Sequence, residues 1–297
     1  MKAGFVSFVG RPNAGKSTLL NQIIGTKLAI VSDKPQTTRN RILGVKPYPH
    51  GQVVFMDTPG IHRPLHRMNV RMVDLALDSI HRVDVLAVIV DASQPVGGGD
   101  RFVIRRLERA KLPVVLVLNK IDRMAKPKLL PVMAWYRAHR EFEAIVPVSA
   151  LTGDGVPELE SLFLKHLPDG EPLYPDDYLT DQPERVFVSE TVREKLLQHT
   201  YDEIPFSSAV IVDRFQESDE RGVIRLYCSI IVEQASQKPI VLGRGGSMIK
   251  RIGTEARLDL ERFFDAKVYL DLHVKIRAEW RENDRLLDDF GVQGPRD

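Results

Sequence analysis

One eight-residue pattern constrains this chain more than any other feature. Residues 10–17 fit G-x-x-x-x-G-K-[ST], with an apolar run before them (5–9) and a stretch of helical periodicity after them (17–25). In that context the backbone N–H groups of a glycine-rich loop and a helix N-terminus surround phosphate oxygens. The alternative is a plain glycine turn. The phosphate-binding residues predicted here are Gly10, Arg11, Pro12, Asn13, Ala14, Gly15, Lys16, Ser17 and Thr18. Lys16 would reach the β- and γ-phosphates, and Ser17 would ligate Mg²⁺.

The first part of the chain alternates short β-rich runs with amphipathic helical stretches. The runs cover 5–9, 53–56, 85–90, 114–118 and 145–148, and the helical stretches cover 17–25, 68–82, 100–110, 127–139 and 156–166. The runs are nearly all apolar and rich in valine, as strands buried on both faces are. We therefore predict an α/β fold, a mostly parallel sheet with helices on both faces.

Residues 168–183 separate this part from a region with a different pattern. They carry four prolines and five acidic residues, which disfavours regular structure. A length of 297 residues also suggests two domains. We predict a domain at 1–167, a linker at 168–183 and a smaller α+β domain at 184–297. A long surface loop within one domain is the alternative for 168–183.

The second region mixes helices and strands in another order. We expect a helix at 189–200, strands at 208–215 and 223–232, and a strand-like run at 239–242. A glycine cluster (243–246), a helix (247–264), a strand (267–277) and a short helical tail follow. Apolar and polar residues alternate along 267–277, which predicts one buried and one wet face.

Charge and composition exclude several classes of protein. The net charge is +2, but residues 1–180 carry +6 and residues 181–297 carry −4, so a nucleic-acid site in the second region must be a local patch. A single cysteine, Cys228, excludes a disulfide scaffold. No apolar stretch approaches the roughly 18 residues of a membrane span, and we expect no signal peptide.

Asp57, Thr58, Pro59 and Gly60 follow the strand-like run 53–56. A carboxylate at the carboxyl end of a strand beside the phosphate loop is placed to hold the magnesium shell. Gly60 has no Cβ, so its backbone N–H can approach a γ-phosphate. Taken alone, the four residues are equally consistent with a simple turn.

Two further motifs follow the next strands. Asn119, Lys120 and Asp122 come after run 114–118, and Ser149, Ala150 and Leu151 end run 145–148. The Asp122 carboxylate can accept two N–H bonds from guanine, a donor pair that adenine lacks. Backbone N–H groups of 149–151 would face guanine O6. Alone, the first motif could simply cap a helix, and the second is weak.

The four motifs in this order resemble the Ras-like, translation-factor-related GTPases, over about residues 1–167. The resemblance implies GTP binding, hydrolysis of GTP to GDP and phosphate with Mg²⁺, and a two-state switch. The family's switch threonine maps to residues 35–39, Pro-Gln-Thr-Thr-Arg, where we choose Thr38 over Thr37 as the magnesium ligand beside Ser17 and Asp57. We predict that the transition state is positioned by Lys16, Thr38, Asp57 and Gly60, and we identify no general base.

One position departs from that family. Many of its members carry a glutamine directly after the DxxG glycine, where it orients the attacking water, and here the residue is Ile61. An isoleucine side chain cannot hydrogen-bond water. Related GTPases use an asparagine at the position of Asn13 to hold K⁺ near the phosphates. Potassium-stimulated hydrolysis is therefore a hypothesis, and a purely structural role for Asn13 is its alternative.

The glycine cluster points to nucleic acid. Gly243, Arg244, Gly245 and Gly246 form a G-x-x-G loop that enters a helix, and such a loop can pass close to a nucleic-acid backbone. Residues 238–251 hold four basic residues and no acid, a patch of +4. We predict RNA contacts by Arg244, Lys250 and Arg251, with the three glycines allowing close approach. A lone G-x-x-G is weak evidence by itself.

The second region resembles a KH domain of the bacterial type. VLGRGGSMIKRIGTEARLDLE and VYLDLHVKI, with GRPNAGKSTLLN, PQTTRNR and FMDTPGIHRP, resemble the Era family of ribosome-assembly GTPases over essentially the whole chain. The resemblance implies binding to small-subunit (16S) rRNA near its 3′ end and a role in 30S subunit biogenesis. It also implies a cytoplasmic location with peripheral contact at the inner membrane. We favour a monomer.

We therefore predict an RNA-binding GTPase switch. GTP with Mg²⁺ would order the loops at Thr38 and Gly60 and so strengthen RNA binding until hydrolysis. The main alternative is a regulatory GTPase whose second domain docks a protein, which the −4 charge of that region favours. A GTP-dependent RNA-modifying enzyme would need a donor site, for which the sequence has no motif.

Overall fold

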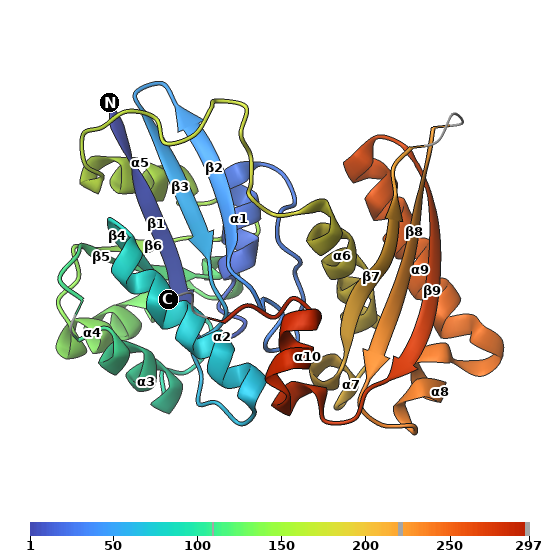
Figure 1. The fold of residues 1–297 in the computed structure, drawn as a ribbon. Coiled ribbons are helices and arrows are strands. Elements are labelled where there is room, and N and C mark those ends of the chain that lie inside the picture. Colours follow the sequence, from blue (N-terminus) through green and yellow to red (C-terminus); the bar gives the residue numbers. More distant parts are fainter. Residues whose placement is uncertain (109, 219–221, 295–297) are drawn as a thin grey trace. The chain divides into compact units, whose positions relative to one another are not determined.

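The computed structural model describes residues 1–108, 110–218 and 222–294, drawn as a ribbon in Figure 1. It divides into two compact units. The first holds Met1–Leu65, Asn69–Asp181 and the segment that begins at Gln293, and the second holds His66–Met68 and Gln182–Val292. Arg109, within predicted helix 100–110, and residues 219–221 and 295–297, within predicted domain 184–297, lie outside the described residues.

The first unit is built on a six-stranded sheet. Its strands are β1 (Lys2–Gly10), β2 (Ile42–Tyr48), β3 (Gly51–Asp57), β4 (Val85–Asp91), β5 (Val114–Asn119) and β6 (Ala144–Pro147), in the order β2-β3-β1-β4-β5-β6. All neighbours are parallel except β2 and β3. The predicted mostly parallel sheet is confirmed. The carboxyl ends of β1, β3, β4 and β5 therefore share one edge, where loops can build a site.

Helices cover both faces of this sheet (Figure 1). On one face lie α1 (Lys16–Ile24) and α5 (Val156–His166), and on the other α2 (Arg67–Asp78), α3 (Gly98–Arg106) and α4 (Leu129–His139). Short 3₁₀ turns at Ser79–Arg82, Ile121–Arg123 and Lys126–Lys128 complete the connections. Phe163 of α5 packs against Phe8 and Phe55, with ring centroids 6.3 and 6.0 Å away. Aromatic packing of this kind fixes the helix on the sheet.

Strand β2 was not predicted from the sequence. Its seven residues include Gly44, Lys46 and Pro47, which all weaken a strand pattern. Proline is tolerated there because β2 is the edge of the sheet, where one side of the backbone needs no ladder partner.

Residues 168–183 form no helix or extended strand, and the structure describes all of them. They nonetheless lie along β2 and β3 of the first unit. The buried Gln52 side chain accepts hydrogen bonds from the N–H groups of Leu173 and Tyr174 and donates one to the Tyr174 carbonyl. Val45 N–H donates to the carbonyl of Leu179 at 2.9 Å. The division between the units falls after Asp181, and helix α6 begins at Glu184.

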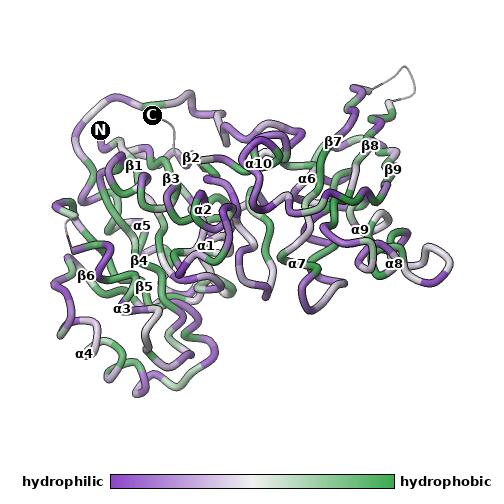
Figure 2. The backbone as a smooth tube through the Cα atoms, turned by 60° about the horizontal axis from the view of Figure 1, so that its bottom comes forward, coloured by the Kyte–Doolittle hydropathy of each residue, from purple (hydrophilic) through white to green (hydrophobic). Residues whose placement is uncertain are grey.

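The second unit is a smaller α+β fold, as predicted. Its elements are α6 (Glu184–His199), α7 (Ile204–Ser207), β7 (Ala209–Gln216), β8 (Val223–Val232), α8 (Gln237–Leu242), α9 (Ser247–Phe264), β9 (Lys267–Ile276) and α10 (Asp284–Asp289), with 3₁₀ turns at Arg244–Gly246 and Trp280–Glu282. The sheet has the order β7-β8-β9, antiparallel then parallel. Helices α6, α8 and α9 share its hydrophobic core. Figure 2 shows hydrophobic residues concentrated in the strands of both units.

The predicted strand-like run at 239–242 is wrong, because these residues belong to helix α8. Four apolar residues cannot distinguish a strand from a short buried helix. Pro239 lies in the first turn of α8, where its missing N–H costs nothing. The buried Gln237 side chain accepts from the N–H groups of Glu233 and Gln234 and so turns the chain into the helix.

Candidate functional sites

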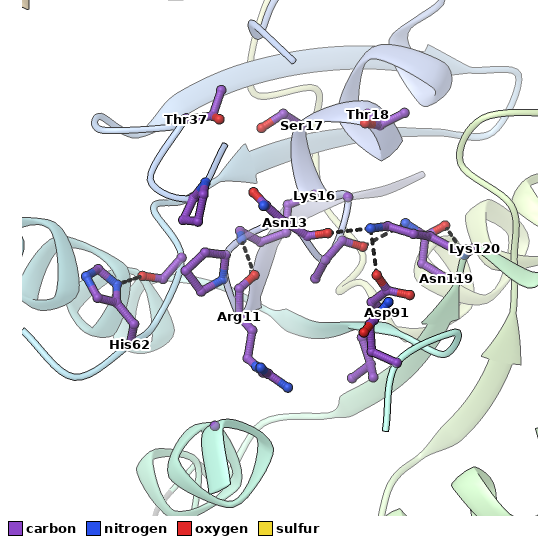
Figure 3. Close-up of a pocket in the computed structure, with 18 of the residues that line it drawn as sticks. Arg11, Asn13, Lys16, Ser17, Thr18, Thr37, His62, Asp91, Asn119 and Lys120 are labelled. Atoms are coloured by element: carbon purple, nitrogen blue, oxygen red, sulfur yellow. Dashed lines mark hydrogen bonds and ion pairs between the residues drawn. The ribbon is translucent and has the colours of Figure 1, made fainter. Parts of the chain in front are cut away.

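The predicted nucleotide residues gather around one cavity of about 1110 Å³ at the carboxyl edge of the first sheet (Figure 3). Its lining includes residues 11–18, 35–38, 60–63, 119–120, 122–123 and 150–151. Five other predicted residues are buried outside this lining: Gly10, Asp57, Thr58, Pro59 and Ser149. The motifs are therefore brought together by strands that end at the same edge.

The three predicted magnesium ligands converge on one point. Ser17 Oγ donates to Asp57 Oδ2 at 2.5 Å and lies 2.7 Å from Thr38 Oγ1. Thr38 Oγ1 is 3.5 Å from the same carboxylate oxygen. Thr37 Oγ1 instead donates to the Lys34 carbonyl at 2.6 Å. Thr38, and not Thr37, therefore lies with Ser17 and Asp57.

The donor set at this point fits Mg²⁺. Two hydroxyls and a carboxylate are hard oxygen ligands of the kind magnesium prefers. Asp57 Oδ1 is buried without a hydrogen-bond partner among the described residues. A buried carboxylate oxygen without a partner is costly, and a bound cation would satisfy it. Ser17, Thr38 and Asp57 could hold the ion directly or through its water shell.

Burial dominates the electrostatics of the two charged groups here. It raises the pKa of Asp57 to about 6, against the opposing effects of the Lys16 charge and hydrogen bonds from Ser17, Thr38 and Thr58. Burial also lowers the pKa of Lys16, and the Asp57 charge opposes this shift. Lys16 Nζ donates to the Arg11 carbonyl at 3.1 Å. Both groups are thus held in a low-dielectric setting, where phosphate and magnesium charges interact strongly.

Gly60 lies against the phosphate loop. A Cβ at this position would stand 2.6 and 2.7 Å from the backbone N and Cα of Pro12, so only glycine fits without a backbone shift. The Ile61 N–H donates to the Gly10 carbonyl at 2.9 Å, and Thr58 Oγ1 donates to the Phe8 carbonyl at 2.7 Å. The DTPG segment is therefore anchored to strand β1.

Asn119 organises the opposite end of the cavity. Its Nδ2 donates to the Ala14 carbonyl at 2.9 Å, and its Oδ1 accepts from the N–H groups of Lys120 and Ala150 at 2.8 and 2.9 Å. One side chain thereby joins three loops. Ser149 Oγ donates to Asp122 Oδ1 at 2.6 Å, which orients the carboxylate predicted to read guanine.

Two of the three backbone N–H groups at 149–151 that were predicted to face guanine already have acceptors within the protein. The Ser149 N–H donates to the Asp154 carbonyl, and the Ala150 N–H donates to Asn119. Among the described residues, the Leu151 N–H alone of the three has no acceptor, and the Leu151 side chain lines the cavity.

Sequence reasoning missed several side chains of this site. Asp91, at the end of β4, accepts from Lys120 Nζ at 2.7 Å, and Lys120 Nζ also donates to the Asn13 carbonyl at 2.6 Å (Figure 3). Burial would raise the pKa of Asp91, but hydrogen bonds from Lys120 and Ser93 and the Lys120 charge lower it overall. An acidic residue ending a parallel strand beside the phosphate loop is the pattern that could have identified Asp91.

Asp100 was missed as well. It is 5% exposed, accepts from Arg11 Nη1 at 2.8 Å and from the Tyr136 hydroxyl at 2.9 Å, and thereby ties the phosphate loop to α3 and α4. No sequence pattern indicated this pairing, because it joins residues 89 apart along the chain.

Two residues bear on how water is positioned. The Ile61 side chain is 1% exposed and packs in the core beneath the sheet, so it makes no polar contact in the cavity. Asn13 Nδ2 donates to the Asp33 carbonyl at 2.6 Å, which joins the phosphate loop to the loop that carries Thr38.

The glycine loop of the second unit is exposed and built for close approach. Gly243, Gly245 and Gly246 have φ of 72°, 58° and 78°, in the region that favours glycine. Helix α9 begins directly afterwards, at Ser247. The side chains of Arg244, Lys250 and Arg251 are exposed. Ile252, on the next turn of the helix, is fully buried and belongs to the core.

Folding offsets part of the charge of this patch. Glu255 accepts from Arg251 Nε at 3.1 Å and pairs with His199 Nε2 at 2.6 Å. The hydrogen bond from His199 is the main cause of a lowered Glu255 pKa, with Arg251 adding to it. The +4 counted along the sequence therefore overstates the local positive charge.

Two family models match the chain. The first, described as 50S ribosome-binding GTPase, covers residues 5–120, and the second, described as KH domain, covers residues 203–281. Together with the cavity and the two folds, these matches define a GTPase followed by a KH domain.

Relatives of known identity extend over nearly the whole chain. GTPase Era of Geotalea uraniireducens is 50% identical over 292 residues, covering 98% of both chains. GTPase Era of Syntrophus aciditrophicus is 47% identical over 290 residues, 98% of this chain and 95% of the relative. The chain belongs to the Era family of GTPases.

Solved structures of Era also match nearly the whole chain. A variant of Aquifex aeolicus Era bound to GDP and AlF₄⁻ matches with a TM-score of 0.94 at 39% identity, covering 98% of this chain and 99% of that one. An Era complex with MgGDPNP and nucleotides 1506–1542 of 16S ribosomal RNA matches with a TM-score of 0.95, at the same identity and coverage. None of the helices in the described part of the chain has the length and apolar character needed to cross a membrane.

Proposed function

We propose that this chain hydrolyses GTP to GDP and phosphate and binds the 3′ region of 16S rRNA during assembly of the small ribosomal subunit. The observation that carries the proposal is the convergence of Ser17, Thr38 and Asp57 beside the phosphate loop, in a chain that also bears an exposed G-x-x-G loop. The solved Era complex holding both MgGDPNP and 16S rRNA nucleotides supports joining the two activities.

The first unit would hold GTP by its two ends. Asp122, oriented by Ser149, would accept N–H bonds from guanine. Lys16 would lie along the β- and γ-phosphates, and Gly60 would present its N–H to the γ-phosphate. A bound Mg²⁺ would neutralise charge that develops on the phosphate oxygens. The protein's contribution is to fix these donors in place before GTP binds.

Potassium stimulation is part of the proposal. Asn13 Nδ2 donates to the Asp33 carbonyl at the phosphate loop, and this leaves the amide oxygen, Asn13 Oδ1, as the atom that could ligate a monovalent cation. We expect hydrolysis to be faster in K⁺ than in Na⁺ at equal ionic strength. Equal rates in the two salts would refute this part, and Asn13→Ala should remove any difference.

The second unit would bind RNA through its exposed loop. The test is binding of an oligonucleotide matching the 16S rRNA 3′ end, with a scrambled oligonucleotide as control. Replacing Arg244 and Gly245 by aspartate should abolish specific binding and leave GTP hydrolysis intact. Arg262→Ala is the control, since Arg262 is an exposed arginine of the same unit that lies on α9, outside the G-x-x-G loop, and pairs with Asp259. Unchanged RNA binding in the aspartate variant would refute the assignment.

Docking of a protein is the second candidate for this unit. The net −4 of residues 181–297 and the pairing of Glu255 with Arg251 favour it. Salt separates the two candidates, because phosphate contacts lose affinity steeply as salt rises.

We infer a cytoplasmic location with peripheral contact at the inner face of the membrane, and a monomer, on the family resemblance. Fractionation of cells and the hydrodynamic mass of the purified chain test these points.

A further inference from the structure

Three hydrogen bonds link the two loops that flank the γ-phosphate end of the cavity. Asn69 Nδ2 donates to Gln36 Oε1 at 3.0 Å, Gln36 Nε2 lies 3.3 Å from His62 Nε2, and His62 Nδ1 lies 2.8 Å from the Gly60 carbonyl. Figure 3 shows the bond between His62 and that carbonyl. All four residues belong to the first unit.

The Gly60 carbonyl and the Asn69 amide fix the two ends of this series of hydrogen bonds. A carbonyl only accepts, so His62 Nδ1 donates to Gly60, and an imidazole that carries one proton accepts at its other nitrogen, here from Gln36 Nε2. Since the Gln36 oxygen accepts from Asn69, its other amide atom, Nε2, is the one that faces His62. The polar chain therefore runs one way, from Asn69 through Gln36 and His62 to Gly60.

The burial of Asn69 and the backbone conformation of Gln36 indicate that the fold imposes this arrangement. Asn69 is 1% exposed, so the first donor is fixed within the fold on helix α2. Gln36 has a φ of 63°, a left-handed conformation that is strained for a residue with a Cβ. Such strain persists where surrounding contacts impose it, and it concentrates at functional sites.

We propose that Gln36 is a positioning residue for GTP hydrolysis. Gln36 lies two residues before Thr38, and the polar chain ties that loop to Gly60, so that the magnesium hydroxyl and the γ-phosphate N–H are brought into register together. This supplies order that Ile61, buried in the core, cannot provide from its own position. The inference rests on the proposed GTP hydrolysis and names residues that act through Thr38 and Gly60.

The experiment measures kcat and KM for GTP, and Kd for GDP, in the full chain. We expect Gln36→Ala to lower kcat about tenfold, because it removes both hydrogen bonds of Gln36 and so breaks the link to Gly60, with the Kd for GDP within twofold of the wild type. Asn69→Ala should lower kcat to a similar extent, and the double variant should be no slower than Gln36→Ala. Gln198→Ala, an exposed glutamine on α6 of the other unit, should leave kcat unchanged.

Three outcomes would overturn the proposal: an unchanged kcat in Gln36→Ala, losses that multiply in the double variant, or weaker GDP binding with kcat intact. Because Asn69 is buried, thermal unfolding with GDP checks that Asn69→Ala folds. If it does not, His62→Asn replaces it: the shorter asparagine can keep a donor at the position of Nδ1 but has no atom at the position of Nε2, so the bond to Gln36 is lost. The value of kcat should again fall about tenfold, and not further with Gln36→Ala. No hydrolysis by the wild type would instead refute the proposed GTPase activity.

Discussion

The nucleotide cavity and the G-x-x-G loop differ in how their ligands are specified. In the cavity, buried side chains from several loops accept and donate in defined directions, with Asn119 alone joining three of them. The G-x-x-G loop offers exposed cations and backbone with positive φ. Directional polar contacts therefore identify a particular ligand, whereas an exposed basic loop identifies only the charge and shape of its ligand. Variants should therefore change the chemistry of the first site and only the strength of the second.

The largest effect should come from the base-reading carboxylate. Asp122→Asn should weaken GTP binding roughly 10²- to 10⁴-fold, because two hydrogen bonds to a charged acceptor are lost at about 1.5–3 kcal/mol each. Xanthosine triphosphate, which presents an oxygen where guanine has an amino group, should then bind better than GTP. Competition between the two nucleotides measures this, and undiminished preference for GTP would contradict the directional reading of the cavity.

Gly60→Ala should be next in size. The added Cβ would stand within 2.7 Å of Pro12 backbone atoms, so the DTPG segment must move, and a displacement near 1 Å costs about 100-fold in rate. Single-turnover hydrolysis measures the loss. Gly170→Ala is the matched control, because its Cβ would meet no atom within 4 Å. Equal rates in both variants would show that the close contact has no functional consequence.

Acid should weaken magnesium binding. The pKa of Asp57 is raised to about 6, so its carboxylate takes up a proton as pH falls through that value, and a protonated carboxyl is a poor ligand. Apparent Mg²⁺ affinity should be constant above pH 7 and fall about tenfold per pH unit well below 6. Titration of Mg²⁺ into the nucleotide complex between pH 5 and 8 measures this. Constant affinity across the range would exclude Asp57 as the group that titrates.

The smallest effect should come from the exposed loop. Arg244→Ala should weaken RNA binding several-fold for every sequence and reduce the salt slope by about one. Arg251→Ala should have less effect, because Glu255 already offsets that charge. A change in sequence preference with Arg244→Ala would show that this loop reads bases, and the contrast between the two sites would then fail.

The sequence could place many residues of the predicted nucleotide site together because they follow buried strands. Runs of valine and isoleucine define those strands, and parallel strands bring their carboxyl ends to one edge. Asp57, Asn119 and Asp122 could therefore be placed before any coordinates. Asp100, Gln36 and Asn69 could not, because their contacts join segments whose approach depends on the packing of α2 and α3 against the sheet.

In the second unit, the length of an element decided whether the sequence could predict it. Helix α9 was predicted at its observed bounds, since its apolar periodicity is long. The short helix α8 was mistaken for a strand, because a six-residue element is decided by tertiary contacts such as those of Gln237. The positive charge of the G-x-x-G patch was overestimated for a similar reason. Glu255 lies outside the basic stretch in the sequence but pairs with Arg251 in space.

We expect the nucleotide bound by the first unit to control RNA binding by the second. The measurement is the Kd for the 16S rRNA 3′-end oligonucleotide with GMPPNP and with GDP, both with Mg²⁺. We predict binding at least about fivefold tighter with GMPPNP, a coupling near 1 kcal/mol. Equal affinity in the two states would contradict the switch, whatever the chain's rate of GTP hydrolysis.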